Sequence, residues 1–166
     1  MFSHDPRFEV CDRGPHGGSL LRSLVDFSAG SPMVAFTPTA VHERPARMTL
    51  QVSERAHIEF TPTFLTYVNH ACDANAYFDV ERMELSALKP IAAGEEVTFF
   101  YPATEWEVAE AFDCACASPG CLGRITGAAL LSAEVLGRHR LAPHITRLLT
   151  QRESARPERL DLPTHT

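Results

Sequence analysis

The stretch YVNHACDANAYF, residues 67–78, constrains the fold of this chain more than any other. Its first half brings an asparagine, a histidine and a cysteine together as Asn69, His70 and Cys72. Its second half opens the run AYFDV at 76–80, whose aromatic and β-branched residues favour a strand. The stretch therefore predicts a β-strand that begins directly after residues of the types that bind metals.

Three of the chain's five cysteines lie close together in FDCACASPGC, where Cys114, Cys116 and Cys121 form a C-x-C-x4-C pattern. An odd number of cysteines in a protein of the reducing cytosol favours a metal site over a set of disulfides. Zinc requires four ligands in a tetrahedron, so a fourth ligand must come from elsewhere. Cys11, Cys72 and a histidine are the candidates.

Length and composition narrow the class of protein. The chain has 166 residues, 45% of them hydrophobic, which suits one domain with a buried core. No apolar run approaches the ~20 residues of a membrane span, and the charged N-terminus lacks a signal segment, so we expect a cytoplasmic protein outside the membrane. The net charge of −6 argues against direct nucleic-acid binding. Acidic residues concentrate between Asp73 and Asp113, where they form either a docking surface for a basic substrate or an ordinary solvated face.

Short strands dominate the middle of the chain, so the expected fold is mainly β. Turn residues and charges separate the strand-like runs, which lie at 48–52, 57–60, 76–80, 83–88 and 96–101. The third and fourth runs predict a hairpin with its turn at Glu81 and Arg82.

Helices are expected in the C-terminal part. Thr104 and Glu107 have the spacing of a capping box, which predicts a short helix over 104–112. Apolar residues at helical spacing predict further helices within 127–141 and 143–153.

Four segments, taken in order, resemble the SET-domain family of protein lysine methyltransferases. They are similar to the family's glycine-rich cofactor loop, its asparagine-histidine motif, its G-E-E-L-T-x-D-Y segment and its post-SET cysteine pattern. The segments are GGSLLRSLVDFSAG at 17–30, NHACDAN at 69–75, LKPIAAGEEVTFFY at 88–101 and FDCACASPGCLGRITG at 112–127. Some residues depart from the family's usual pattern: Ala71, Ala74, Phe100 in place of an aspartate, and Leu20 in place of the loop's second glycine.

The resemblance implies a fold of small β-sheets in which the C-terminal segment threads through a loop to form a pseudoknot. It implies one structural zinc ion, with Cys11 left over as a buried thiol. The implied zinc ligands are Cys72, Cys114, Cys116 and Cys121. The implied layout is a SET domain at 1–112, a post-SET zinc-binding segment at 113–127, C-terminal helices at 128–152 and a flexible tail at 153–166.

The resemblance also implies an activity, the transfer of methyl groups from S-adenosylmethionine to the ε-amine of a protein lysine. The amine must be neutral and must meet the sulfonium methyl in line at about 3 Å, so positioning carries most of the catalysis. The family's catalytic tyrosine corresponds to Tyr101, and the lysine channel is expected around Tyr101, Phe99 and Tyr67. Phenylalanine at position 99 leaves room for more than one methyl group.

The family's cofactor contacts correspond to residues in several distant segments. Asn69 and His70 match positions that contact the cofactor partly through the backbone, and His70 is not assigned as a general base. Trp106 and Leu122 are candidates for covering the adenine, beside the simpler interpretations of a helix-packing tryptophan and a surface leucine. The expected cofactor-binding set is Gly17, Gly18, Ser19, Asn69, His70, Tyr101 and Leu122.

The acceptor remains open at this point. Only residues 42–65 lie between the N-terminal loop and the asparagine-histidine motif, so the insert that shapes peptide recognition in the family is short. The acceptor is either a basic protein or peptide that carries lysine, or a small amine or amino acid. A third interpretation is a SET-like binding or scaffolding protein without catalysis, which Leu20 and Phe100 favour and Asn69 and Tyr101 oppose. The oligomeric state is not predicted.

Overall fold

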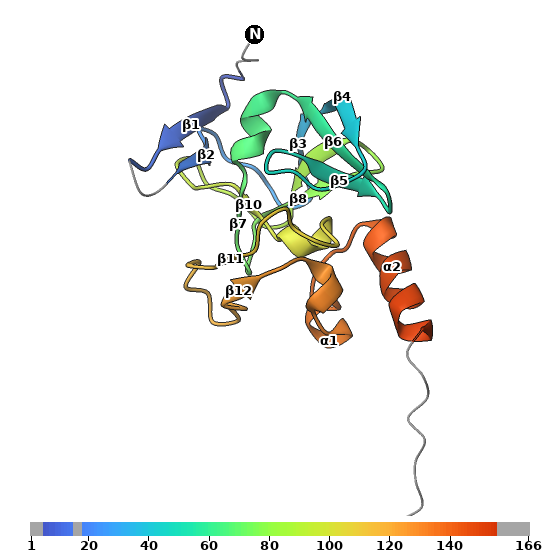
Figure 1. Ribbon diagram of the computed structural model, residues 1–166. Coiled ribbons are helices and arrows are strands. Elements are labelled where there is room, and N and C mark those ends of the chain that lie inside the picture. Colours follow the sequence, from blue (N-terminus) through green and yellow to red (C-terminus); the bar gives the residue numbers. More distant parts are fainter. Residues whose placement is uncertain (1–4, 15–17, 156–166) are drawn as a thin grey trace, which may run out of the picture.

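The computed structural model describes residues 5–14 and 18–155, which form four small β-sheets followed by helices (Figure 1). This confirms the mainly β fold. The strands are β1 Phe8–Asp12, β2 Ser19–Ser23, β3 Pro32–Ala35, β4 Thr37–His42, β5 Leu50–Ser53, β6 Ala56–Thr61, β7 Asn69–His70, β8 Ala76–Asp79, β9 Glu84–Ala87, β10 Thr98–Phe99, β11 Phe112–Asp113 and β12 Arg124–Ile125. The helices are the 3₁₀ turns η1 Thr63–Tyr67, η2 Tyr101–Ala103 and η3 Ala128–Leu130, and the α-helices α1 Ala133–Leu136 and α2 Pro143–Ser154.

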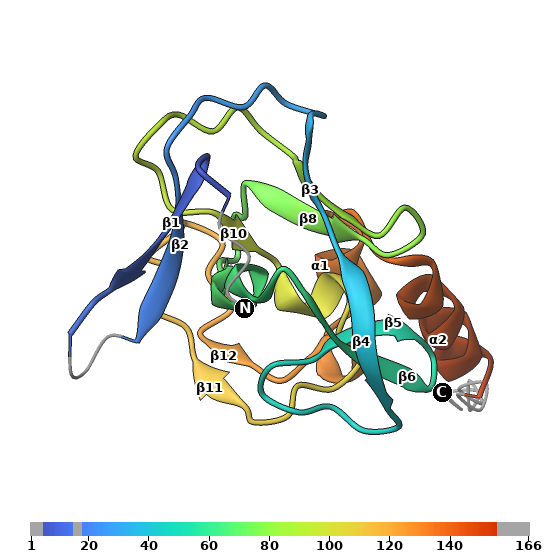
Figure 2. The ribbon, with the colours of Figure 1, turned by 90° about the horizontal axis from the view of Figure 1, so that it is seen from above.

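The largest sheet contains the crossing that the family resemblance implies. Its strand order is β3-β9-β8-β10-β7, so β10 lies between β7 and β8, which follow one another in the chain. Strand β10 is parallel to both neighbours, with Thr98 opposite Asn69 and Phe99 opposite His70. Figure 2 shows β10 between the β1–β2 hairpin on one side and the β4–β6–β5 sheet on the other. Residues 98–101 therefore pass directly beside 69–72.

The predicted strands are present, with shifted ends. Runs 48–52, 57–60, 76–80 and 83–88 correspond to β5, β6, β8 and β9, and the last two form the expected antiparallel hairpin. Run 96–101 is extended only at Thr98 and Phe99, because η2 begins at Tyr101. Strands β1 to β4 were not predicted. Strands β3 and β4 pair with β9 and β6, so their partners lie far along the chain.

A cluster of buried phenylalanine rings packs at the central sheet. Phe36, Phe60 and Phe78 are buried, with ring centroids 5.4 to 6.0 Å apart. The ring of Phe99 meets that of Phe78 edge to face at 4.8 Å. Because such pairs restrict ring orientation, the core holds Phe99 in one position next to the strand crossing.

The prediction of a helix over 104–112 is wrong, because the structure has no helix there. The backbone N–H of Gln51 donates to the Glu105 carboxylate at 2.8 Å, and the N–H of Trp106 donates to Gln51 Oε1 at 2.8 Å. The Thr104 hydroxyl donates to Glu105 at 3.2 Å rather than capping a helix. These buried contacts with β5 outweigh the local helix propensity and keep the segment irregular.

The C-terminal helices are partly as expected. Helix α2 confirms the helix predicted within 143–153, whereas 127–141 forms only η3 and the short α1. His144 fixes the start of α2 through a 2.7 Å hydrogen bond from Nε2 to the Thr104 carbonyl, and Arg147 pairs with Glu54 at 2.9 Å. Within the described ranges, none of the helices has the length and apolar character needed to span a bilayer.

Candidate active site

The strand crossing brings the main predicted site residues together. The backbone N–H of Tyr101 donates to Nδ1 of His70 at 3.2 Å, and the Tyr101 hydroxyl donates to the carbonyl of Val68 at 3.4 Å. The rings of Phe99 and Tyr101 lie 4.6 Å apart. Asn69 and His70 reach this point on β7, and the two aromatic residues arrive on and just after β10. Residues some thirty positions apart in the sequence thus share one site.

The protonation states at this site follow from burial. Burial, with the charges of Glu105 and Glu96, raises the pKa of Tyr101 to about 12, so the phenol is protonated at neutral pH. Burial, with the charge of His139, lowers the pKa of His70 to about 4. Since Nδ1 of the neutral ring accepts from Tyr101, the proton lies on Nε2, 3.4 Å from Sγ of Cys72. The tyrosine is a hydrogen-bond donor, and the imidazole is a structural link.

Asn69 joins the site to the N-terminal hairpin. Its side-chain nitrogen Nδ2 donates to the backbone carbonyl of Ser19 at 2.9 Å and to Oε1 of Glu96 at 3.1 Å. Ser19 is the first residue of β2, and Glu96 lies just before β10, where it forms an isolated antiparallel β-bridge with Arg22 of β2. Three segments that are distant in sequence therefore meet at one carboxamide. Sequence reasoning included Glu96 in the G-E-E motif but gave it no role.

The N-terminal loop is described in part. Gly18 has a φ of +65°, in the region that favours glycine, and its carbonyl accepts from the N–H of Arg13 at 2.8 Å. Leu20 is an ordinary residue of β2 with its side chain buried, so the fold accommodates a leucine at this position. The predicted cofactor contact of Gly17 lies outside the described residues.

The three remaining candidates, Tyr67, Leu122 and Trp106, lie at separate places. Tyr67 ends η1 next to Val68, and it packs against the hydrophobic core while remaining partly exposed. Leu122 donates its N–H to Sγ of Cys72 at 3.4 Å, so it lies beside the cysteine cluster. Trp106 packs against the core beneath the guanidinium of Arg152, which is 5.8 Å from the ring centroid. Trp106 therefore packs against the core from an irregular segment and not from the helix predicted over 104–112.

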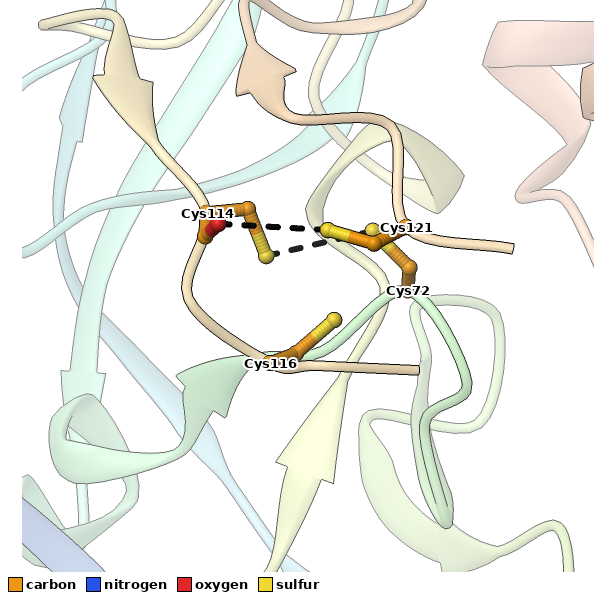
Figure 3. Close-up of side chains that lie close together, drawn as sticks. All are labelled: Cys72, Cys114, Cys116 and Cys121. Carbon is orange, nitrogen blue, oxygen red and sulfur yellow. Dashed lines mark hydrogen bonds between the residues drawn. The ribbon is translucent and has the colours of Figure 1, made fainter. Parts of the chain in front are cut away.

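The four predicted ligand cysteines form one cluster (Figure 3). Their Sγ atoms all lie within 4.8 Å of one another, and those of Cys72 and Cys114 are 3.9 Å apart. Cys114 and Cys116 follow β11, Cys121 comes after the turn at residues 119–120 and precedes β12, and Cys72 follows β7. The described cysteines are all free thiols. Cys11, expected to be buried, is instead partly exposed on β1, with Sγ 3.3 Å from the Glu9 carboxylate.

The cluster fits a tetrahedral zinc ion. With zinc–sulfur bonds of about 2.3 Å, the sulfurs of a ZnS₄ site lie about 3.8 Å apart, close to the distance between Cys72 and Cys114. Burial raises the pKa of the Cys72 thiol to about 12. For Cys116, hydrogen bonds with Ser118 overcome the opposing effect of burial and lower the pKa to about 6. A cation between the sulfurs would stabilise all four thiolates.

A ring stack explains one departure from the family pattern. Phe100 is buried and stacks on His139, with ring centroids 3.7 Å apart and planes inclined by 11°. His139 follows α1, in the C-terminal segment, so its contact with Phe100 was not foreseeable from local sequence. An aspartate at position 100 would place a charge in this buried stack. Phenylalanine suits the C-terminal segment of this particular chain.

Comparison with known proteins agrees with this geometry. The SET domain family model matches residues 12–102. Methyltransferase flvH of Aspergillus flavus is 33% identical over 153 residues, which cover 91% of this chain and 85% of that protein. A histone-lysine N-methyltransferase of Saccharomyces cerevisiae, H3 lysine-36 specific, is 34% identical over 86 residues, which cover 48% of this chain and 12% of that protein.

Solved structures share the fold. The structure of KRYPTONITE in complex with mCHG DNA and SAH has a TM-score of 0.54 at 22% identity, covering 71% of this chain and 29% of that one. KRYPTONITE in complex with mCHH DNA, H3(1-15) peptide and SAH gives 0.52 at 21% identity, covering 70% and 29%. The family match, the extent of the identity to flvH and the crossed strands place the chain in the SET-domain family of methyltransferases.

Proposed function

We propose that this SET-domain methyltransferase transfers methyl groups from S-adenosylmethionine to the ε-amine of a lysine in a protein or peptide. The observation that carries the proposal is the meeting of Asn69 and His70 with Tyr101 at the crossing of β7 and β10. Tyr101 presents a protonated phenol there, beside the carbonyl of Val68. A donor and an acceptor at one buried point suit an amine and the methyl group that it receives.

Positioning and desolvation of the amine account for most of the expected catalysis. The lysine ammonium first loses a proton to water, and its lone pair then forms the new nitrogen–carbon bond as the carbon–sulfur bond breaks. The electron pair stays on sulfur, so the products are a methylated ammonium and S-adenosylhomocysteine. Tyr101 orients the amine and Phe99 lines its channel. The high pKa of Tyr101 excludes the phenolate as a base at neutral pH.

The cysteine cluster has a structural role in this proposal. One zinc ion held by Cys72, Cys114, Cys116 and Cys121 would tie the segment after Tyr101 to β7. Four thiolates leave no open coordination position, so the metal itself would not touch the substrate. Ligation by these cysteines would order the short strands β11 and β12, which pair through only two residues each.

A small amine or amino acid is the second candidate acceptor. The match to flvH, which is named only as a methyltransferase, spans 85% of that protein, whereas the match to the histone methyltransferase spans 12%. Between β4 and η1 the insert comprises only β5, β6 and their connections. An insert this short offers little surface for binding a peptide. It therefore favours either a peptide that is loosely bound or a small-molecule acceptor.

One experiment separates the acceptors. Zinc-loaded protein is incubated with methyl-labelled S-adenosylmethionine and either lysine-containing peptides or a panel of small primary amines and amino acids. Label in peptides that depends on Tyr101 supports the protein lysine proposal. Label in small amines alone supports the second candidate. A third outcome is that the protein binds the cofactor but labels neither peptides nor small amines, with no difference between wild type and Tyr101→Phe. That outcome contradicts both acceptor proposals and leaves the interpretation as a scaffolding protein without catalysis.

A further inference from the structure

The carboxamide of Asn69 has a determined orientation. Its two contacts in the described part of the chain, the Ser19 carbonyl and the Glu96 carboxylate, are groups that only accept hydrogen bonds. Both must therefore face the NH₂ end of the amide, which places Oδ1 on the opposite side. Within residues 5–14 and 18–155, no protein group donates to this oxygen. Oδ1 is thus a directed acceptor at the junction of three segments.

Glu96 is itself held in place. Its other carboxylate oxygen, Oε2, accepts from the guanidinium of Arg13, at the start of the N-terminal loop. Its backbone carbonyl accepts from Nδ2 of Asn75 at 2.9 Å, and the side chain is only 27% exposed. Arginine is only a donor, so Oε2 accepts from Arg13 while Oε1 accepts from Asn69. The carboxylate is anchored on both oxygens and cannot readily turn away from Asn69.

We propose that Glu96 is a positioning residue that fixes the carboxamide of Asn69 so that Oδ1 receives the α-ammonium of S-adenosylmethionine. The proposal rests on the proposed function. Among the hydrogen-bond donors of the cofactor, the ammonium alone carries a positive charge, so its hydrogen bond to a fixed amide oxygen is stronger than one from a neutral donor. Glu96 would thereby contribute to cofactor recognition through Asn69, without a contact of its own with the cofactor.

An isosteric substitution tests this role. In Glu96→Gln, the amide oxygen must face the donor Arg13, which turns the new NH₂ group toward the NH₂ of Asn69. Two donors then oppose each other, and Asn69 loses the contact that fixes its orientation. The matched control is Glu95→Gln, which makes the same charge change at the neighbouring residue. The Glu95 carboxylate accepts from the N–H of Ala92 at 2.7 Å and lies outside this network.

Binding of two ligands distinguishes the positioning role of Glu96 from a general loss of order in the β1–β2 hairpin. Calorimetric titration uses S-adenosylhomocysteine and an analogue in which hydrogen replaces the α-amino group. We expect Glu96→Gln to weaken S-adenosylhomocysteine binding about tenfold and to change binding of the analogue less than about twofold. Glu95→Gln should change neither. Equal weakening of both ligands by Glu96→Gln, or no weakening at all, overturns the inference.

A double-mutant cycle gives an independent answer. If Glu96 acts through Asn69, Glu96→Gln has no further effect on S-adenosylhomocysteine binding in an Asn69→Ala background. Additive losses overturn the positioning role even if the single variant is partly destabilised. Wild-type protein that is folded, holds zinc and fails to bind S-adenosylhomocysteine overturns the proposed function itself, and the inference with it. The two failures are therefore distinct.

Discussion

Tyr101 and His70 are joined by a hydrogen bond of 3.2 Å from the backbone N–H of the tyrosine to Nδ1 of the imidazole. The other ring nitrogen, Nε2, lies 3.4 Å from Sγ of Cys72. A single neutral imidazole therefore connects the proposed catalytic residue with the cysteine cluster. Order in the cluster would reach the proposed catalytic residue through this imidazole, and several measurable consequences follow from that connection.

Replacing His70 should destabilise the strand crossing. In His70→Ala the partly buried N–H of Tyr101 loses its acceptor, and the ring contacts with Phe100 and Phe112 disappear. We expect a loss of about 2 kcal/mol in the free energy of unfolding, measured by urea denaturation. His70→Asn, which returns an acceptor near Nδ1, should recover part of this loss. Equal stability of wild type and His70→Ala would contradict the link.

Tyr101→Phe should separate catalysis from cofactor binding. The substitution removes the phenol that donates to the Val68 carbonyl and keeps the ring packed on Phe99. We expect kcat to fall about 100-fold, with the Kd for S-adenosylhomocysteine nearly unchanged. Single-turnover methyl transfer and calorimetry measure the two quantities. A large loss of cofactor affinity with normal turnover of bound cofactor would show that the phenol serves binding instead.

Zinc content should depend on the four clustered cysteines alone. We expect about one zinc ion per chain by elemental analysis, and its removal by a chelator should lower the melting temperature. Cys114→Ser should lose the metal. Cys11→Ser is the control, because Cys11 lies on β1 away from the cluster, and it should retain the full content. Metal retained by Cys114→Ser would contradict a site of four thiolates.

Acid should weaken the docking of α2 through His144. Burial lowers the pKa of this imidazole. The hydrogen bond to Thr104 and the charge of Glu105 raise the pKa but only partly offset the burial, and the charges of Arg147 and His57 lower it further. The unfolded chain binds a proton below about pH 6.5 that the folded protein excludes. The free energy of unfolding should therefore fall as the pH drops below this value.

The control for this pH dependence is His144→Gln, whose amide can still donate to the Thr104 carbonyl but does not titrate. Urea denaturation at about pH 7.5 and about pH 5.5 should show a smaller loss of stability for the variant than for wild type. An identical loss in both proteins would show that other groups dominate the acid response.

Cys114, Cys116 and Cys121 and the hairpin of β8 and β9 were predictable because local spacing encodes each of them. Cys72 as the fourth ligand and the role of the asparagine-histidine motif came only from the family resemblance. The threading of β10 between β7 and β8 followed only from the family resemblance, since periodicity carries no information on which strands become neighbours. The helix predicted over 104–112 failed because the buried exchange between Gln51 and Glu105 satisfies the backbone differently. The stack of Phe100 on His139 joins segments that no local pattern connects.

The most direct test of the methyltransferase account is calorimetric titration of the zinc-loaded protein with S-adenosylmethionine and S-adenosylhomocysteine. The account predicts that wild type binds both, that Asn69→Ala weakens binding because Oδ1 and the contacts with Ser19 and Glu96 are lost, and that Tyr101→Phe binds nearly as wild type. Absence of binding at about millimolar cofactor, in protein shown to be folded and to hold zinc, would contradict the account and leave a SET fold that serves as a scaffold.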